Sequence, residues 1–111
     1  MARPAAPTIA WPQGEHAFWL NVGELRALEQ NCDAGFMVVW QRLMAGQARI
    51  DDIFHTIRLG LIGAGMVPEK AMALTVKAFD ESSAVTLMRT AEPILRVSIL
   101  WDEATTSTGE E

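Results

Sequence analysis

The sequence has few residues that could carry catalytic or metal chemistry. Among 111 residues there is one cysteine, Cys32, and there are two histidines, His16 and His55. A single cysteine excludes an intramolecular disulfide and a cluster of thiolate ligands. The histidines lack the i, i+4 spacing of a helical metal site, and Cys32 has no basic neighbour that would activate its thiol. We expect no catalytic residues, no cofactor and no bound metal, so the sequence predicts a protein that is not an enzyme. His55 is interpreted as a solvated surface residue.

Long apolar runs and an excess of positive charge are also missing. The longest uncharged apolar stretch, Leu59 to Val67, has nine residues and contains three glycines, whereas a membrane span needs about 20. The N-terminal residues lack the continuous apolar stretch of a secretory signal. Residues 1–101 carry nine bases and ten acids, and the last ten residues carry four acids and no base. We therefore expect a cytoplasmic protein without a membrane or nucleic-acid partner.

What is present is enough apolar material for one core, because half of the residues are hydrophobic and 21% are charged. We interpret residues 8–101 as a single helical domain with an N-terminal hairpin. Residues 1–7 contain two prolines and three alanines and predict a flexible arm. Residues 102–111 are polar, acidic and aperiodic, and predict a disordered acidic tail.

Hydrophobic periodicity predicts the secondary structure. Apolar residues on either side of a Pro-Gln-Gly turn predict a hairpin with strands at residues 8–11 and 16–20. Five later segments have helical spacing and predict helices that begin near residues 22, 34, 51, 68 and 84. Pro93 lies inside the last one and predicts a kink or a split there. The predicted fold class is mostly α (α+β), a short N-terminal β-hairpin followed by a compact bundle of four to five helices.

Residues that favour helix ends mark the boundaries of these segments. Asn21 and Glu24 predict a capping pair at the start of the first helix. Asp33 and Ser83 are predicted to cap the second and the last helix, and Gly46 to end the second. The apolar stripes of the helices predict a core made of Leu25, Leu28, Phe36, Val39, Leu43, Ile53, Phe54, Ile57, Leu61, Met72, Val76 and Phe79.

The third helix is apolar on almost all sides at its end, so one of its faces is expected to meet the first helix, the last helix or another molecule. Gly60 and Gly63 are expected to let a partner helix or a second copy of the chain approach the backbone there. Because the body is nearly neutral, we expect binding to rest on apolar contacts. The predicted interaction surface consists of Leu59, Ile62, Met66 and Trp101, and the tryptophans of the hairpin are the next candidates.

Three segments resemble a known family. They are Leu20-Asn-Val-Gly-Glu-Leu-Arg-Ala-Leu-Glu29, Gly35-Phe-Met-Val-Val, and Ile57-Arg-Leu-Gly-Leu-Ile-Gly-Ala-Gly-Met66 followed by Pro68 and Ala71. In order and spacing they look like the tail assembly chaperone family of gene transfer agents and related siphophages, earlier described as a tail tube protein family. The likeness runs from about Gly14 to Asp80 and consists of packing residues. The Pro-containing segment near residue 93 departs from the Ala/Leu-rich final helix of that family.

The resemblance implies a non-enzymatic protein of bacteriophage tail and virion assembly, made in the cytoplasm of a bacterial host. Its implied partner is the tail tape measure protein, with the tail tube protein and a second copy of the chain as further candidates. Two alternatives stay open. One is a structural tail component that is retained in the particle. The other is a small DNA-binding regulator that uses the second and third helices as a helix-turn-helix, which the near-neutral body disfavours.

Overall fold

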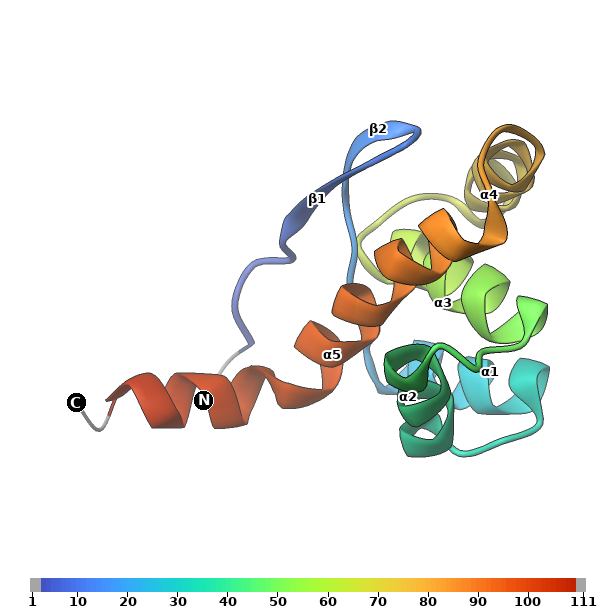
Figure 1. Cartoon of the computed structure of the whole chain (residues 1–111). Coiled ribbons are helices and arrows are strands. Elements are labelled where there is room, and N and C mark those ends of the chain that lie inside the picture. The colour runs from blue at the N-terminus through green and yellow to red at the C-terminus, as the bar shows by residue number, and fades with distance from the viewer. Residues whose placement is uncertain (1–2, 110–111) are drawn as a thin grey trace.

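An antiparallel hairpin and five helices form the described part of the chain (Figure 1). The computed structural model describes residues 3–109, and side chains are described for residues 3–102. The predicted fold class is confirmed: a two-stranded hairpin is followed by helices that pack into one body. The elements are β1 (Thr8–Trp11), β2 (Gly14–Ala17), α1 (Val22–Cys32), α2 (Phe36–Ala45), α3 (Ile50–Gly63), α4 (Pro68–Glu81) and α5 (Ala84–Gly109).

The hairpin is shorter than predicted because its second strand ends at Ala17. Thr8 pairs with Ala17 and Trp11 with Gly14, so the turn is confined to Pro12 and Gln13. The following residues, 18–20, leave the sheet and run in extended form over the helices, and all three are about 1% exposed.

Most of the predicted helix ends are confirmed. Asn21 donates its backbone N–H to the Glu24 carboxylate at 2.9 Å, and the Thr86 N–H is donated to Ser83 Oγ at 3.2 Å. Gly46 ends α2 in the left-handed region with a φ of 71°. The prediction for Asp33 was wrong. This residue ends α1 in the left-handed conformation with a φ of 52°.

The start of α2 is capped from another helix. The backbone N–H of Phe36 is donated to the carboxylate of Glu29, which belongs to α1, at 2.9 Å. The Glu29 carboxylate thus accepts one of the free N–H groups at the start of α2, which a local cap residue would otherwise accept. The loop between α1 and α2 is therefore fixed by a contact that local capping patterns do not predict.

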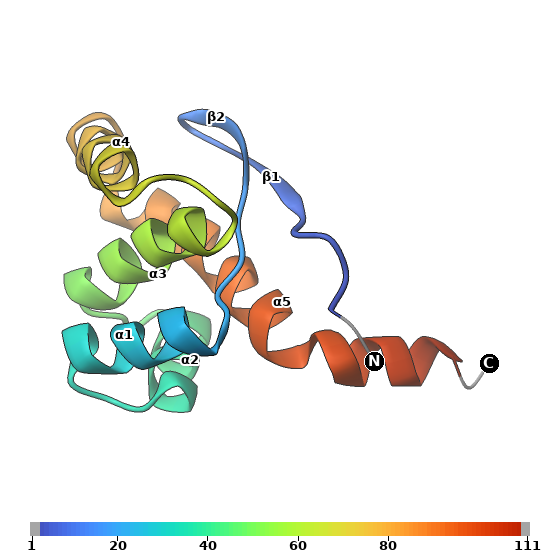
Figure 2. The same ribbon diagram turned by 180° about the vertical axis from the view of Figure 1, so that it is seen from behind.

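Helix α3 lies at the centre of the body and packs against α1, α4 and α5 (Figures 1 and 2). Ile53, Ile57 and Leu61 face the core and are at most 3% exposed. A helix covered by three others is unsuited to enter a DNA groove, which requires a free recognition face. This placement argues against the helix-turn-helix alternative.

Helix α4 packs through small residues, and here the predicted core was wrong. Ala71, Thr75 and Ala78 are fully buried, whereas Met72 and Val76 are 42% and 44% exposed. Small side chains let α4 lie close to α3, and this turns the larger apolar residues outward. Of the other predicted core residues, Leu28, Val39, Leu43, Ile53, Ile57 and Leu61 are buried, and Leu25, Phe36, Phe54 and Phe79 are half-buried.

Helix α5 is continuous through Pro93 and does not split there. It changes direction along its length, and its last turns project from the body (Figures 1 and 2). The helix extends to Gly109, beyond Trp101 where the apolar periodicity ends. The predicted tail therefore begins inside this helix, and residues 110–111, like residues 1–2 of the predicted arm, lie outside the described part.

Candidate protein-interaction surface

Of the four residues predicted to form an interaction surface, Leu59 is buried and the other three are half-buried. Leu59 is 4% exposed within the core, so it has no free surface to offer a partner. Ile62 and Met66 are half-buried and pack against the core at the end of α3 and just beyond it. Trp101 is half-buried on α5, with its ring centroid 6.5 Å from that of Trp19.

The glycines expected to admit a partner are covered by the chain itself. The extended segment after β2 crosses α3 at this point, and Trp19 donates its backbone N–H to the Gly60 carbonyl at 2.9 Å. A Cβ on Gly60 would lie 2.9 Å from Ile94 Cγ2 and 3.1 Å from Phe18 Cδ1. A Cβ on Gly63 would collide with the carbonyl of Trp19. The two glycines therefore allow a close contact within the chain and leave no room for another molecule.

The hairpin tryptophans are buried and hold the N-terminal part of the chain in place. Trp11 is 7% exposed, donates its Nε1–H to Nδ1 of His16 at 2.8 Å, and packs edge-on against Phe18. Trp19 is 1% exposed, and the guanidinium carbon of Arg3 lies 4.9 Å from its ring centroid. This is cation–π geometry. Neither tryptophan offers a free anchor for a partner.

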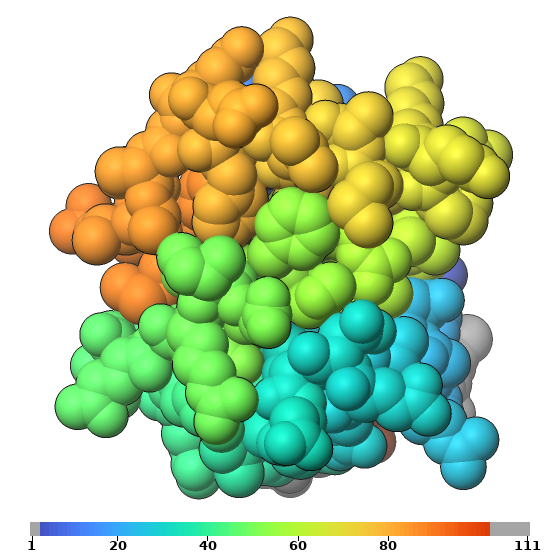
Figure 3. Space-filling model, turned by 90° about the vertical axis from the view of Figure 1, so that its right-hand side faces the viewer, coloured from blue at the N-terminus to red at the C-terminus, as the bar shows by residue number. Residues whose placement is uncertain are grey.

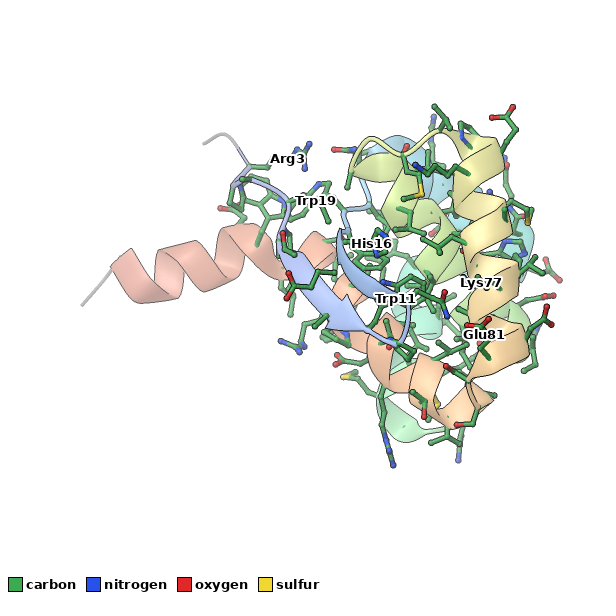
Figure 4. The ribbon with its side chains drawn as sticks, turned by 90° about the horizontal axis from the view of Figure 1, so that it is seen from above. Arg3, Trp11, His16, Trp19, Lys77 and Glu81 are labelled. Atoms are coloured by element: carbon green, nitrogen blue, oxygen red, sulfur yellow. The ribbon has the colours of Figure 1, made fainter. Side chains whose placement is uncertain are left out.

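A groove lies between the hairpin and α4. Its two adjoining parts have volumes of about 370 and 360 Å³ and share His16, Met66 and Lys70. Viewed from above, His16 on β2 and Lys77 on α4 come from the two sides of this groove (Figure 4). We call it the hairpin groove and define it by His16, Met66, Lys70, Ala73, Leu74 and Lys77. Among the predicted interaction residues, Met66 lines this groove, and Trp101 lines a separate hollow of about 310 Å³ beside Trp19 and Leu20.

One hydrogen bond joins the tip of the hairpin to the end of α4. Gln13 Nε2 donates to Glu81 Oε1 at 3.1 Å. Glu81 is labelled near this tip in Figure 4. The contact ties the turn of the hairpin to α4 and so helps to set the distance between the two walls of the hairpin groove.

A second groove, of about 560 Å³, lies between the end of α2 and the middle of α5. Its apolar lining includes Met44, which is 52% exposed, and Met88. Apolar spacing alone does not predict this exposure, because Met44 follows the buried Leu43 on the apolar side of α2. Glu92 at this groove accepts hydrogen bonds from Trp40 Nε1 at 3.0 Å and from Arg96 Nε at 3.0 Å. Charges of both signs therefore surround the methionines.

The outward face of α4 is a third apolar area. Met72 and Val76 are one helical turn apart and both exposed. In Figure 3 α4 forms the upper part of the face turned to the viewer. Phe79, one turn further along, has its ring centroid 5.4 Å from that of Phe54 on α3. The exposure of these residues follows from the small-residue packing of α4 and was not predicted.

The polar and reactive groups inside the body have structural partners. Asp52 is fully buried, pairs with Arg42 at 3.1 Å, and accepts the Arg49 backbone N–H at 2.9 Å. Burial, followed by the nearby Asp52 charge, raises the pKa of Cys32 to about 12. Among the residues with described side chains, no three His, Cys, Asp or Glu side chains are grouped to hold a metal ion. No helix in that part of the chain is long and apolar enough to cross a membrane.

Histidine 55 is less exposed than the sequence indicated. Its ring packs edge-on against Phe54, 5.3 Å between centroids, and Arg58 Nε donates to its Nδ1 at 3.3 Å. Burial, followed by the positive charge of Arg58, lowers the pKa of His55 below its ordinary value of 6.5. The residue is half-buried in a structural contact.

Comparison with known proteins identifies the family. The model of a phage tail assembly chaperone family, described as "Phage tail tube protein, GTA-gp10", matches residues 5–101. The chain belongs to this family. The match extends through both strands and most of α5, so the family pattern covers the body that carries the three apolar areas. No curated protein and no solved structure matches the chain. The family match over residues 5–101 confirms the resemblance that the packing segments indicated.

Proposed function

We propose that this protein is a non-enzymatic tail assembly chaperone that binds the tape measure protein in the bacterial cytoplasm while the tail forms. Membership of a phage tail assembly family is the observation that carries the proposal. Grooves lined by apolar side chains are the usual sites for helical partners. Here the hairpin groove and the Met44–Met88 groove supply such sites.

The exposed methionines support a client of repetitive helical character. Methionine side chains are flexible and polarisable, so one surface can contact many related apolar sequences. Met44 and Met72 are 52% and 42% exposed, and Met66 lies in the hairpin groove. A chaperone that covers successive segments of a long protein needs this tolerance.

A structural tail component is the second candidate, because the family is described as a tail tube protein. The two functions differ in whether the chain remains in the particle. Mass analysis of purified particles separates them, since a chaperone is absent from the finished particle and a tube subunit is present in many copies. Co-expression with the tape measure protein, followed by a pull-down on the chaperone, tests the binding itself.

A further inference from the structure

We propose that the hairpin groove binds an amphipathic client segment in which apolar side chains are flanked by acidic ones. The inference rests on the proposed function, and it adds a charge preference that the near-neutral body does not indicate. It is carried by the chemistry of the groove, whose floor is apolar and whose ionisable residues are all basic or histidine.

The floor of the groove supplies the apolar contact. Met66 and Leu74 are half-buried and pack against the core from this side, and Ala73 lies beside them on α4. Apolar side chains laid on this floor would lose contact with water, which is the main favourable contribution to association. The Gln13–Glu81 hydrogen bond at one end of α4 keeps the hairpin wall in position.

The walls supply the charge. Lys70 and Lys77 are the two lysines of the chain, and both line this groove opposite His16 of β2. Both lysines are exposed, and within the described residues neither is hydrogen-bonded or paired with a carboxylate. An arriving acidic side chain would therefore not have to displace an internal partner. Exposed ion pairs between these lysines and acidic client side chains would each contribute little affinity. Their main effect would be on which client sequence is preferred and on the rate of association.

The spacing of the lysines describes the partner further. Lys70 and Lys77 are seven positions apart on α4, which is two helical turns or about 10.5 Å along the helix axis. A client helix lying along α4 would match them with acids seven residues apart, with apolar residues three and four positions after the first acid to meet Met66 and Leu74.

The other surfaces lack this match. At the Met44–Met88 groove, Arg96 is already paired with Glu92, so among the described contacts Arg89 is the one unpaired base of that lining, whereas the hairpin groove has two unpaired lysines. The acidic C-terminal segment of a second copy carries four acids in residues 102–111, but alanine, threonine, serine and glycine lie between them. That segment would leave the apolar floor uncovered, so a client with an apolar stripe fits better.

A charge reversal on the groove tests the inference. The double variant Lys70→Glu with Lys77→Glu is expected to bind the tape measure protein about tenfold more weakly at low salt. Added salt should weaken binding of the wild type and strengthen binding of the variant, because the reversed groove repels acids and salt screens that repulsion. The matched control is Arg26→Glu with Arg49→Glu, which changes net charge equally at exposed sites away from the groove. The control should bind like the wild type.

Zero-length cross-linking identifies the occupant. A carbodiimide joins carboxylates directly to lysine, and the chain offers only Lys70 and Lys77 besides its amino terminus. In the complex with the tape measure protein, mass spectrometry should find both lysines linked to acids of apolar-flanked client segments. Links to residues 102–111 of the chain itself would assign the groove to a second copy and overturn the inference.

The outcomes separate the inference from the proposed function. If the wild type does not bind the tape measure protein at all, the proposed chaperone function fails. The inference that the groove binds a segment of that protein then fails as well. If the wild type binds and the lysine variant binds equally well, the inference about the hairpin groove fails and the proposed chaperone function stands. An equal loss in the lysine variant and in the arginine control would mean that net charge alone acts, which also contradicts a specific groove.

Discussion

Gly63 lies so close to Trp19 that a side chain at this position would collide with the Trp19 carbonyl. One turn earlier, Gly60 accepts the Trp19 N–H at 2.9 Å. The glycines of α3 therefore join the segment after the hairpin to the central helix. This contact fixes the position of the hairpin and of the groove beside it.

Gly63→Ala should lower the free energy of unfolding by about 3 kcal/mol, since the added methyl group meets a backbone atom that cannot move independently. Urea denaturation measures the change. Gly23→Ala is the matched control, because nothing lies within 4 Å of a Cβ there and alanine favours the helix by up to about 1 kcal/mol. A neutral effect of Gly63→Ala would mean that the segment does not pack on α3 as described.

The two ion pairs of the body should differ in their effect on stability. Asp52→Ala removes a fully buried carboxylate that pairs with Arg42 and caps α3, and should cost about 3 kcal/mol. Glu92→Ala removes a more exposed pair with Arg96, together with the bond from Trp40, and should cost about 1 kcal/mol. Chemical denaturation of both variants checks the order, and a reversed order would contradict the central position of Asp52.

Stability should fall as the pH drops below 6.5, because His55 takes up a proton less readily in the folded chain. The unfolded chain binds that proton at about its ordinary pKa, so between the two pKa values it holds more protons than the folded chain. Stability then rises with pH in that window and is fully present above it. Melting experiments from about pH 7.5 to about pH 5.5 should show a smaller slope for His55→Gln than for the wild type.

Removal of residues 103–111 should leave the melting temperature unchanged. The last turns of α5 project from the body (Figures 1 and 2), so they can bury little apolar surface to offset their loss of conformational entropy. Calorimetry of the shortened chain measures this. A clear decrease would show that the acidic end docks on the body.

The sequence predicted the elements of the fold because their signals are local. Apolar spacing located the five helices, and Asn21, Gly46 and Ser83 marked three of their ends. The register of α4 was wrong, because periodicity weighs Met72 and Val76 above Ala71 and Ala78. Close packing against α3 reverses that order, and such packing depends on residues distant in the sequence.

The interaction surface stays a prediction, and the structure leaves its residues only partly accessible for a related reason. An apolar stretch with glycines, such as residues 59–66, is compatible with a partner helix and with a segment of the same chain. The structure places residues 18–20 against Gly60 and Gly63, while Leu59 is buried in the core and Met66 lies at an open groove. Lys70 and Lys77 become one site only once the hairpin lies opposite α4, and periodicity alone gives no sign of that arrangement.

The soluble yield of the tape measure protein, with and without this chain, tests the central claim most directly. Co-expression with the wild type should give a soluble complex that is retained in a pull-down. Met66→Asp in the hairpin groove should leave the client insoluble, since a charged group on the apolar floor adds a desolvation cost. Met37→Asp, at an exposed site 43% accessible on α2, should behave like the wild type, and circular dichroism should show both variants folded. A client that is equally soluble without the chain, or a chain retained in many copies in purified particles, would contradict the account.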